Sequence, residues 1–565
     1  MRSNTPAEAI AQIGAALQRG DLAAARALAE AARCAHPDEA GLAAAAGELA
    51  LQAGDIEAAI EHFAEAVAAE PHSPDYAIDL AGALERAGAH KKALAALAPH
   101  EARGATLLRY AAARANLHQA LGEPAEAARW HDRALALDPL HGPALAARAR
   151  LALERGEADA LARFDRALKV SSGDARLWLG KAQALECAGD RKGARAIAEQ
   201  LCAQAPGFIA ALRFLAGLRL AAGEPDFALP FAEAARKAPR DPNIAAAHVE
   251  TLAGLDRSHE ACAVAAAARA RFPGEPHFAL LEAIHASSAG EWDRAEAIFA
   301  GLPANTPQRA LHEARHALRA RDLERTLDLL ERALAQAPWD IAAWALRGIA
   351  WRLAQDDRAH WLHEQPGLVE LRPLIAREGL IEEASEALRA LHEGAAMPLG
   401  QSLRGGTQTR GILFHRTEPV IAELHAAIRA TLEAYRAQLP PTDPDHPLLR
   451  HGAREWQLEG SWSVRLSGGG GRGGDHHAAH IHPQGILSSA LYCVVPPATG
   501  QGERGDGCLE IGRPPPNLGL DLEPIRTIRP LPGHLALFPS TLYHGTTPFA
   551  AAERMTVAFD VAPTD

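Results

Sequence analysis

Three histidines and one arginine near the C-terminal end of the 565-residue chain have the types and spacing of a metal centre beside an anion site. His480 and His482 stand in the segment HIHP, and residues two apart face the same side of an extended strand, so both imidazoles could ligate one metal ion. His544 follows an apolar segment and a proline, at the kind of strand end that could supply a third imidazole. Arg554 begins the segment RMTVAF, where a buried guanidinium would need an anionic partner, best matched geometrically by a carboxylate.

Short strands divided by Gly and Pro turns must position these residues. The segments SWSVRL, AHIHP, ILSSALYCVVP, GCLEIG, HLALFP and MTVAFDV all have strand character, and one amphipathic helix precedes them at about 419–438. Alternation along the last segment puts Arg554, Thr556, Ala558 and Asp560 on one face. The pattern predicts a β-sandwich or jelly roll with an open mouth for a ligand, and a Gly-rich turn or lid at 468–474 beside the site.

The first 360 residues repeat with a period of 34. Glycines recur at or near that interval, and Asp256 fills one gap in the series. An Ala follows each Gly after five residues in most units, as Ala59 follows Gly54, and a second Ala and a Pro come later in the unit. This spacing indicates a helix that ends at a left-handed Gly, a tight turn, and a second helix that ends at Pro. Large residues such as Phe63 would fill the gaps between repeats.

These units resemble the tetratricopeptide repeat, and Ala40–Ser73 matches nearly every position of its pattern. About ten units fit between Pro6 and Asp356, some of them degenerate, such as the unit with Arg321 and Thr326 at signature sites. The resemblance implies an all-α superhelical solenoid whose concave face holds a peptide or a partner protein. The alternative is that the solenoid packs only on its own C-terminal domain.

Composition divides the chain in two. Hydrophobic residues make up 48% but aromatic residues only 5%, because alanine dominates the repeats, whereas Gly, Pro and His are concentrated after residue 400. We therefore expect an α+β multidomain protein with a solenoid at 1–358, a helical connector at 359–400 and a jelly-roll domain, also called a double-stranded β-helix, at 401–565.

The charge balance and the apolar segments limit the classes of partner that we expect. Against 70 acidic residues there are 58 basic ones and no basic block, so we expect no nucleic-acid partner. The N-terminal segment lacks the pattern of a signal peptide and no long apolar run occurs, so we expect no membrane partner and a cytoplasmic protein. The six cysteines contain no CxxC pair, and we expect them to be reduced.

The C-terminal segment resembles the iron(II)- and 2-oxoglutarate-dependent oxygenases, in particular a bacterial and phage group with an H-x-H-P motif. The matching elements are HIHP at 480–483, SALYCV around Tyr492, GHLALFPSTLYH at 533–544 and RMT at 554–556. They keep the order and spacing of the group from about Ser461 to Val561. The resemblance implies Fe(2+) as cofactor, 2-oxoglutarate as cosubstrate, and a dioxygenase that hydroxylates its substrate while releasing succinate and carbon dioxide.

Carried over residue by residue, the resemblance makes His480 and His544 iron ligands. Arg554 would hold the distal carboxylate of 2-oxoglutarate, helped by Thr556 and Tyr492. The departure is His482, which stands where most of the superfamily has a carboxylate.

Two arrangements therefore stay open at residue 482. Either three histidines bind the metal, or a carboxylate comes from Asp560 or Asp475, the latter of which would face away on a regular strand. His476 and His477 are expected to be exposed loop residues. No catalytic residue is expected beyond the metal site.

Other functions remain possible. One alternative is a non-catalytic tetratricopeptide adaptor with a degenerate jelly roll, and another is a three-histidine dioxygenase that does not use 2-oxoglutarate. The substrate could be a protein side chain, a peptide or a small metabolite.

Overall fold

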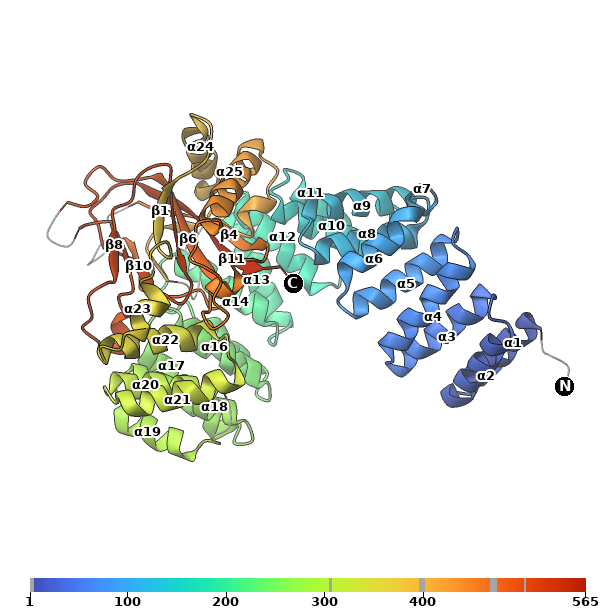
Figure 1. The fold of residues 1–565 in the computed structure, drawn as a ribbon, viewed down its shortest axis with the longest axis horizontal. Coiled ribbons are helices and arrows are strands. Elements are labelled where there is room, and N and C mark those ends of the chain that lie inside the picture. Colours follow the sequence, from blue (N-terminus) through green and yellow to red (C-terminus); the bar gives the residue numbers. More distant parts are fainter. Residues whose placement is uncertain (1–4, 304–306, 396–401, 468–474, 502–504, 565) are drawn as a thin grey trace. The chain divides into compact units, whose positions relative to one another are not determined.

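The computed structural model describes residues 5–303, 307–395, 402–467, 475–501 and 505–564 (Figure 1). The chain forms two compact units, Met1–Gly180 and Lys181–Asp565. The division falls inside the repeat array rather than near residue 400, where composition placed a boundary. The Gly-rich run at 468–474, expected as a turn or lid, lies outside the described residues.

The first unit consists of helix pairs joined by tight turns. Its helices are α1 (Pro6–Gln18), α2 (Leu22–Ala35), α3 (Ala40–Ala53), α4 (Ile56–Ala69), α5 (Pro74–Arg86), α6 (His90–Leu97), α7 (Glu101–Gly104), α8 (Leu108–Ala120), α9 (Pro124–Leu137), α10 (Gly142–Glu154) and α11 (Ala160–Val170), and α12 (Ala175–Cys187) crosses into the second unit.

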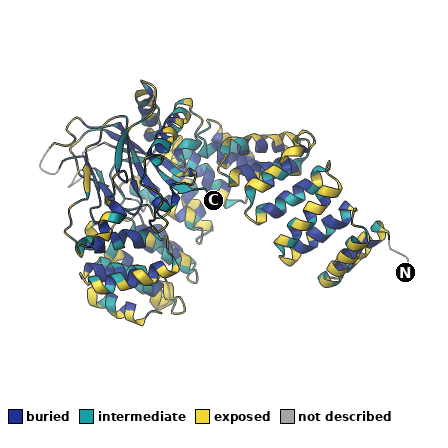
Figure 2. Ribbon diagram, viewed as in Figure 1, coloured by how far each residue is buried: buried dark blue, intermediate teal, exposed yellow. Residues whose placement is uncertain are grey.

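The repeat pattern explains how each pair packs. The glycines of the 34-residue series all take the left-handed conformation, with φ between 66° and 85°, and Gly54 ends α3 in this way. In α4, Ala59 and Ala66 are fully buried and Phe63 is 1% exposed. The Phe63 ring lies only 2.8 Å from where a Cβ on Gly47 would be, so a small residue is required there. Figure 2 shows the buried residues along the faces where neighbouring helices meet. These residues form the tetratricopeptide solenoid that the sequence predicts.

The second unit continues the array. Its repeat helices are α13 (Arg191–Gln204), α14 (Ile209–Ala221), α15 (Leu229–Lys237), α16 (Pro242–Ala253), α17 (Ser258–Arg271), α18 (Pro276–Ser288), α19 (Trp292–Gly301), α20 (Pro307–Arg319), α21 (Leu323–Gln336), α22 (Ile341–Leu353) and α23 (Arg358–His363).

The last repeats share a hydrophobic core with the C-terminal domain. Leu330, Leu346 and Trp351 of α21 and α22 pack in one cluster with Leu518 and Tyr543. Because this core joins the end of the solenoid to the β-rich domain, both belong to one compact unit.

Two sheets build the C-terminal domain. Its strands are β1 (Glu370–Pro373), β2 (Leu403–Arg404), β3 (Thr407–Gln408), β4 (Trp456–Leu466), β5 (His476–His477), β6 (Leu487–Val494), β7 (Leu509–Ile511), β8 (Arg526–Ile528), β9 (His534–Pro539), β10 (His544–Thr546) and β11 (Arg554–Pro563). The larger sheet has the order β1-β9-β6-β11-β4-β3 and the smaller one β10-β7-β8, while β2 pairs with β5. Apolar residues of both sheets, among them Tyr492, Ile511 and Phe538, form one core, as in a jelly roll.

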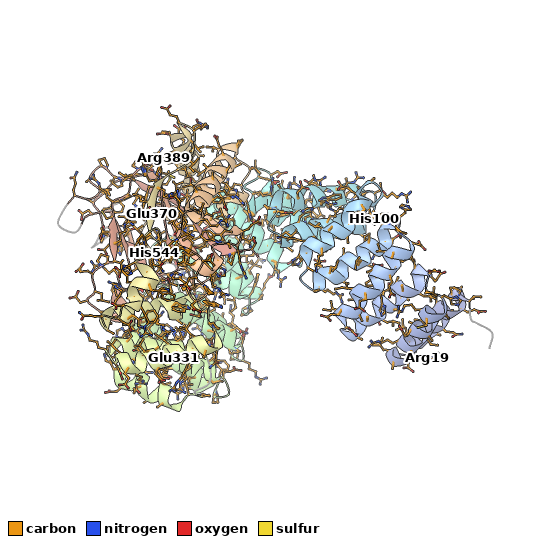
Figure 3. All side chains as sticks on the ribbon, viewed as in Figure 1. Arg19, His100, Glu331, Glu370, Arg389 and His544 are labelled. Atoms are coloured by element: carbon orange, nitrogen blue, oxygen red, sulfur yellow. The ribbon has the colours of Figure 1, made fainter. Side chains whose placement is uncertain are left out.

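The connector expected to be helical at 359–400 is helical only in part. β1 pairs antiparallel with β9, with Glu370 opposite Leu537, and so extends the larger sheet; Glu370 is labelled in Figure 3. This strand is short and ends in Pro, so local sequence gives little sign of it. Two helices, α24 (Leu380–Glu393) and α25 (Pro419–Arg436), join the core of the larger sheet, and the second of them matches the predicted amphipathic helix.

None of the helices in the described ranges combines the length and apolar character needed to cross a membrane.

Candidate metal centre

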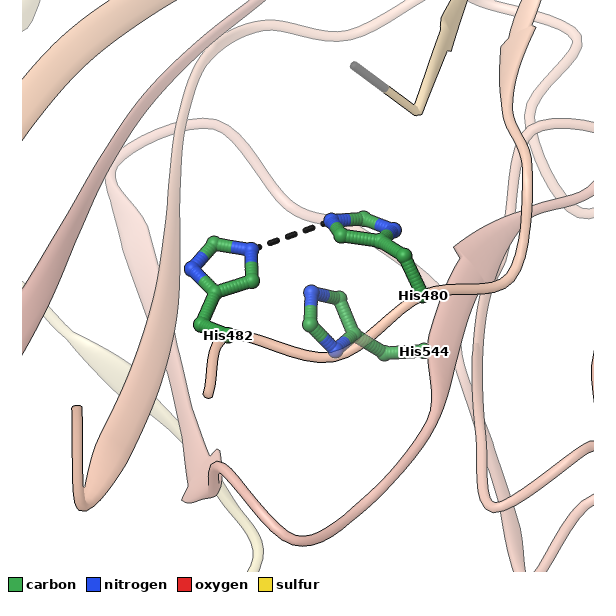
Figure 4. Close-up of side chains that lie close together, drawn as sticks. All are labelled: His480, His482 and His544. Carbon is green, nitrogen blue, oxygen red and sulfur yellow. Dashed lines mark hydrogen bonds between the residues drawn. The ribbon is translucent and has the colours of Figure 1, made fainter. Parts of the chain in front are cut away.

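Three imidazoles converge at one end of the jelly roll. His544 opens β10, and its backbone forms an isolated bridge with His480, which brings the two distant segments together. One nitrogen from each of His480, His482 and His544 lies within 4.8 Å of the others (Figure 4). The HIH segment is not the regular strand that the sequence suggested, because only His480 is paired. The structure nevertheless brings together all three histidines that the sequence singled out.

Hydrogen bonds at the outer nitrogens set the orientation of all three rings. The Nδ1 atom of His480 lies 2.8 Å from the carbonyl oxygen of Ala478, and that of His544 lies 3.2 Å from the carbonyl oxygen of Leu542. The Nδ1 atom of His482 contacts a carboxylate oxygen of Asp560. Since carbonyl and carboxylate oxygens only accept, each Nδ1 must donate, which leaves an Nε2 lone pair on every ring.

These lone pairs face one another. The Nε2 atoms of His480 and His482 are 3.0 Å apart, and with both protons on Nδ1 neither can donate to the other. Two nitrogens about 2.1 Å from one metal ion and at right angles to each other would be separated by about 3.0 Å. The spacing of His480 and His482 therefore fits a divalent metal, with a nitrogen of His544 within 4.8 Å of both. A cation between the rings would remove the repulsion of the lone pairs.

Burial favours the neutral form of His480 and His544, which metal binding requires. Burial, reinforced by the neighbouring His482, lowers the pKa of His480 to about 3. Burial also holds the pKa of His544 well below its ordinary value, and His480 and His482 lower it further. A proton therefore competes poorly for the metal-facing nitrogens of His480 and His544 near neutral pH.

Neither aspartate weighed as a substitute ligand belongs to the cluster of metal-binding atoms among the described residues. Asp560 instead contacts His482: its carboxylate accepts a hydrogen bond from the Nδ1 atom and thereby orients that ring. Asp475 is 3% exposed and accepts a hydrogen bond from the backbone amide of Ser467. The geometry thus favours three histidines over two histidines and a carboxylate.

The guanidinium of Arg554 is buried in the same cavity without a balancing charge. The residue is 3% exposed, donates to the carbonyl oxygen of Gly507 at 2.8 Å, and has its guanidinium carbon 5.5 Å from the centre of the Tyr492 ring and 5.9 Å from that of Phe549. No carboxylate in the described part of the chain forms an ion pair with it. Burial accordingly lowers its pKa, since the charged form is poorly solvated there.

The nearest acidic neighbour in the sequence is committed elsewhere. Glu553 forms ion pairs with Arg389 of α24 at 2.9 Å and with Arg465 of β4 at 2.9 Å. Arg389, labelled in Figure 3, lies on α24. Among the described residues that line the cavity, none therefore supplies an ion-pair partner for the positive charge of Arg554.

A second polar group lies beside Arg554. The Tyr492 hydroxyl is buried and has no hydrogen bond of regular geometry to any described residue. Burial raises its pKa to about 12, although the nearby Arg554 guanidinium acts in the opposite direction. An anionic oxygen placed here would satisfy both Tyr492 and Arg554. This pair of groups fits a carboxylate, as expected for the far end of 2-oxoglutarate.

One cavity of about 1620 Å³ joins the histidines to the arginine. Arg554, Thr556, Ala558 and Asp560 of β11 all line it, which confirms that they share a face. His476 and His477 are not in an exposed loop; they form β5, are partly buried and line the same cavity.

Some lining residues were not foreseen from the sequence. The indole of Trp462 lies 5.5 Å from the His482 ring, centre to centre, and Asp256 and Arg404 reach the cavity from separate segments. The only sign of them in the sequence was that Asp256 stands where other repeats have Gly.

Comparison with known families agrees with this structure. Residues 460–560 match the family described as "Putative 2OG-Fe(II) oxygenase". Residues 50–117 match one tetratricopeptide repeat family, and residues 10–74 and 158–208 match another. The chain therefore carries tetratricopeptide repeats in its N-terminal part and, at 460–560, a segment that matches the putative 2OG-Fe(II) oxygenase family.

A search of the curated proteins finds no match to this sequence. Among solved structures, the chain is similar to PilF of Pseudomonas aeruginosa, with 20% identity over 37% of this chain and 95% of the other and a TM-score of 0.33. A tetratricopeptide repeat protein of Parabacteroides merdae has 20% identity over 43% and 96%, with a TM-score of 0.33. Yeast Tom70 has 13% identity over 59% and 92%, with a TM-score of 0.25. Similarity of this extent assigns neither a partner nor an activity to the chain.

Proposed function

We propose that the chain is an iron(II)- and 2-oxoglutarate-dependent dioxygenase that hydroxylates a C–H bond of its substrate. One observation carries the proposal: a single cavity combines three clustered imidazole nitrogens with a buried guanidinium that pairs with no carboxylate of the described residues. The imidazoles suit a divalent metal, and the guanidinium suits the distal carboxylate of a dicarboxylate.

His480, His482 and His544 would hold the iron, with Asp560 and two backbone carbonyls keeping their Nδ1 protons in place. When bound, iron and 2-oxoglutarate supply the oxidation: one oxygen atom of O₂ enters the substrate as hydroxyl and the other enters succinate, with release of carbon dioxide.

Arg554 would orient 2-oxoglutarate by its far carboxylate, and the Tyr492 and Thr556 hydroxyls would add hydrogen bonds to the same group. Tyr492 is fully buried and Thr556 is 8% exposed, so the carboxylate would be held away from bulk water, where its ion pair with Arg554 is stronger. A dioxygenase that does not use 2-oxoglutarate would have no need for this arginine.

The repeats of the first unit would hold a protein or peptide partner, which is the common task of tetratricopeptide solenoids. In this proposal they recruit the partner, while the second unit carries out the chemistry.

Oxygen consumption and succinate formation test the proposal. The full chain, supplied with Fe(2+), should form one succinate per 2-oxoglutarate consumed, and His544→Ala should abolish the reaction. Oxygen consumption that is indifferent to 2-oxoglutarate would favour the three-histidine alternative. Failure to bind any metal would favour the non-catalytic adaptor.

A further inference from the structure

The cavity is not enclosed by the jelly roll alone. Part of its lining comes from the solenoid, at the turn that joins α16 to α17 and at the end of α18, including Asp256, Ser258, His259 and Ser288. All of these residues belong to the same compact unit as the histidine cluster. A repeat turn is therefore the outer wall of the cavity that holds the metal site.

The volume of the cavity exceeds what a small substrate needs. Sites for small molecules commonly enclose about 300–1000 Å³, whereas this cavity measures about 1620 Å³. 2-Oxoglutarate would occupy only the deep part beside Arg554, so most of the space remains for the substrate.

The chemistry of the lining suits a polypeptide. Gln408, Gln484 and Asn517 contribute amides, and Ser258 and Ser402 contribute hydroxyls, groups that can both donate to peptide carbonyls and accept from peptide N–H groups. The described lining contains two arginines and no lysine; Arg554 lies deep, and Arg404 pairs with Asp256. Such a surface does not fit a polyphosphate backbone.

Asp256 connects the repeat wall to the jelly roll by a side-chain contact. Its φ is 59°, in the left-handed region that most turns of the series fill with Gly and that Arg321 and Gln355 also adopt at later turns. The carboxylate pairs with Arg404 of β2, with Nε of Arg404 at 3.1 Å, and the side chain of Asp256 is 63% exposed. So exposed a pair adds little stability. Both residues of the pair line the cavity, so the pair links the repeat wall to the jelly roll there.

We propose that the substrate is an extended segment of polypeptide that lies between the α16–α17 turn and the histidine cluster, with the repeat wall as part of the substrate site. This inference rests on the proposed function for the reaction, in which a C–H bond of the bound segment becomes C–OH. It means that repeat residues at the α16–α17 turn contact the substrate, as the jelly roll does.

Selection from a displayed library of random peptides tests the inference. The full chain would be immobilised with Mn(2+) in place of iron and N-oxalylglycine in place of 2-oxoglutarate, and enriched peptides would be measured on variants. His259→Trp fills the cavity from an exposed lining position, whereas Glu260→Trp changes the next residue, which is exposed and not part of the lining. We expect the first to weaken peptide affinity by about tenfold or more and the second by less than about twofold.

A second variant tests the inference even if His259→Trp does not fold. Asp256→Arg places a like charge beside Arg404, and Arg321, with φ 61°, shows that such a turn accepts Arg. It should weaken peptide binding by about threefold or more without lowering the unfolding temperature. Absence of enriched peptides, or peptides that bind the His259→Trp and Asp256→Arg variants as tightly as the wild type, would overturn the inference.

The succinate assay separates this inference from the proposed function. Succinate formation without cavity-dependent peptides would refute the peptide substrate and leave the dioxygenase proposal standing. Cavity-dependent peptides without succinate formation would refute the dioxygenase proposal and leave the peptide site standing.

Discussion

At the scale of single residues, the site contains polar atoms that have no hydrogen-bond or charge partner among the described residues. The Nε2 atoms of His480 and His482 face each other at 3.0 Å with no proton to share, and the buried Arg554 forms no ion pair with a carboxylate in the part of the chain that the structure describes. Each arrangement costs free energy in the empty protein, and each is relieved by a ligand of opposite character, a cation in one place and an anion in the other.

Asp560 should control metal affinity through His482. Asp560→Asn removes the charge that holds the Nδ1 proton, so we expect the affinity for Mn(2+) or Fe(2+) to fall by about 10–100-fold. Isothermal titration would measure it. Glu553→Gln is the matched control, because Glu553 binds arginines rather than a histidine and should leave metal affinity unchanged. Equal affinities for wild type and Asp560→Asn would show that this carboxylate does not support the metal.

At the scale of elements, the repeat turns depend on left-handed residues. Gly290 has a φ of 84°, and Gly290→Ala should lower the free energy of unfolding by about 1 kcal/mol because the Cβ meets the backbone in this conformation. Urea unfolding would measure the change.

Asp256→Gly is the reverse exchange at an equivalent turn. Relief of strain and the added freedom of the unfolded chain nearly cancel, so the free energy of unfolding should change by less than about 1 kcal/mol. A large loss would mean that the pair with Arg404 contributes to stability, contrary to its exposure.

The same elements show how far the sequence could predict the structure. The glycine series and the buried alanines were predictable because the two helices joined by each turn belong to the same repeat. The strand pattern of β6, β9 and β11 was likewise local. By contrast, β1 pairs with β9 across more than half of the C-terminal domain, and nothing in its four residues specifies that partner.

In the candidate site, too, the contacts between distant segments are the part that the sequence did not predict. His480, His482, His544 and Arg554 were predictable because a family resemblance carries them. The bond from His482 to Asp560 and the repeat wall at Asp256 were not, since each depends on segments that meet only in the folded chain.

At the scale of the whole molecule, the last repeats and the jelly roll should fold together. A fragment of residues 401–565 lacks β1, α24 and the repeat side of the core that contains Leu518 and Tyr543, so it should not form a cooperative fold. A fragment of residues 181–565 retains these elements and should unfold cooperatively. Circular dichroism during heating would compare the two. Cooperative unfolding of the shorter fragment would contradict the shared core.

Buried neutral histidines should make the second unit sensitive to acid. Burial lowers the pKa of His446 to about 4 and that of His363 to about 3. Their ordinary value is 6.5, so the unfolded chain binds more protons between pH 6.5 and 4, and stability should fall as the pH falls through that range, by roughly 3 kcal/mol for one such group.

The His446→Asn variant tests the origin of this slope. The Nδ1 atom of His446 accepts from the amides of Leu448 and Leu449, and the side-chain oxygen of Asn can take that role without titrating. Urea unfolding at several pH values should give a shallower dependence for the variant. An unchanged slope would assign the acid sensitivity to other groups.

The most direct test of the central claim is the stabilisation of the Mn(2+)-loaded chain by 2-oxoglutarate, measured for wild type and Arg554→Met. Without 2-oxoglutarate the variant should be at least as stable as the wild type, because it removes a buried charge that forms no ion pair with any described residue. At a concentration of about 100 times the dissociation constant, 2-oxoglutarate should stabilise the wild type by about 2.7 kcal/mol and the variant hardly at all, with metal affinity equal in both. Equal stabilisation of both proteins, or none of the wild type, would contradict the assignment of Arg554 as the carboxylate site.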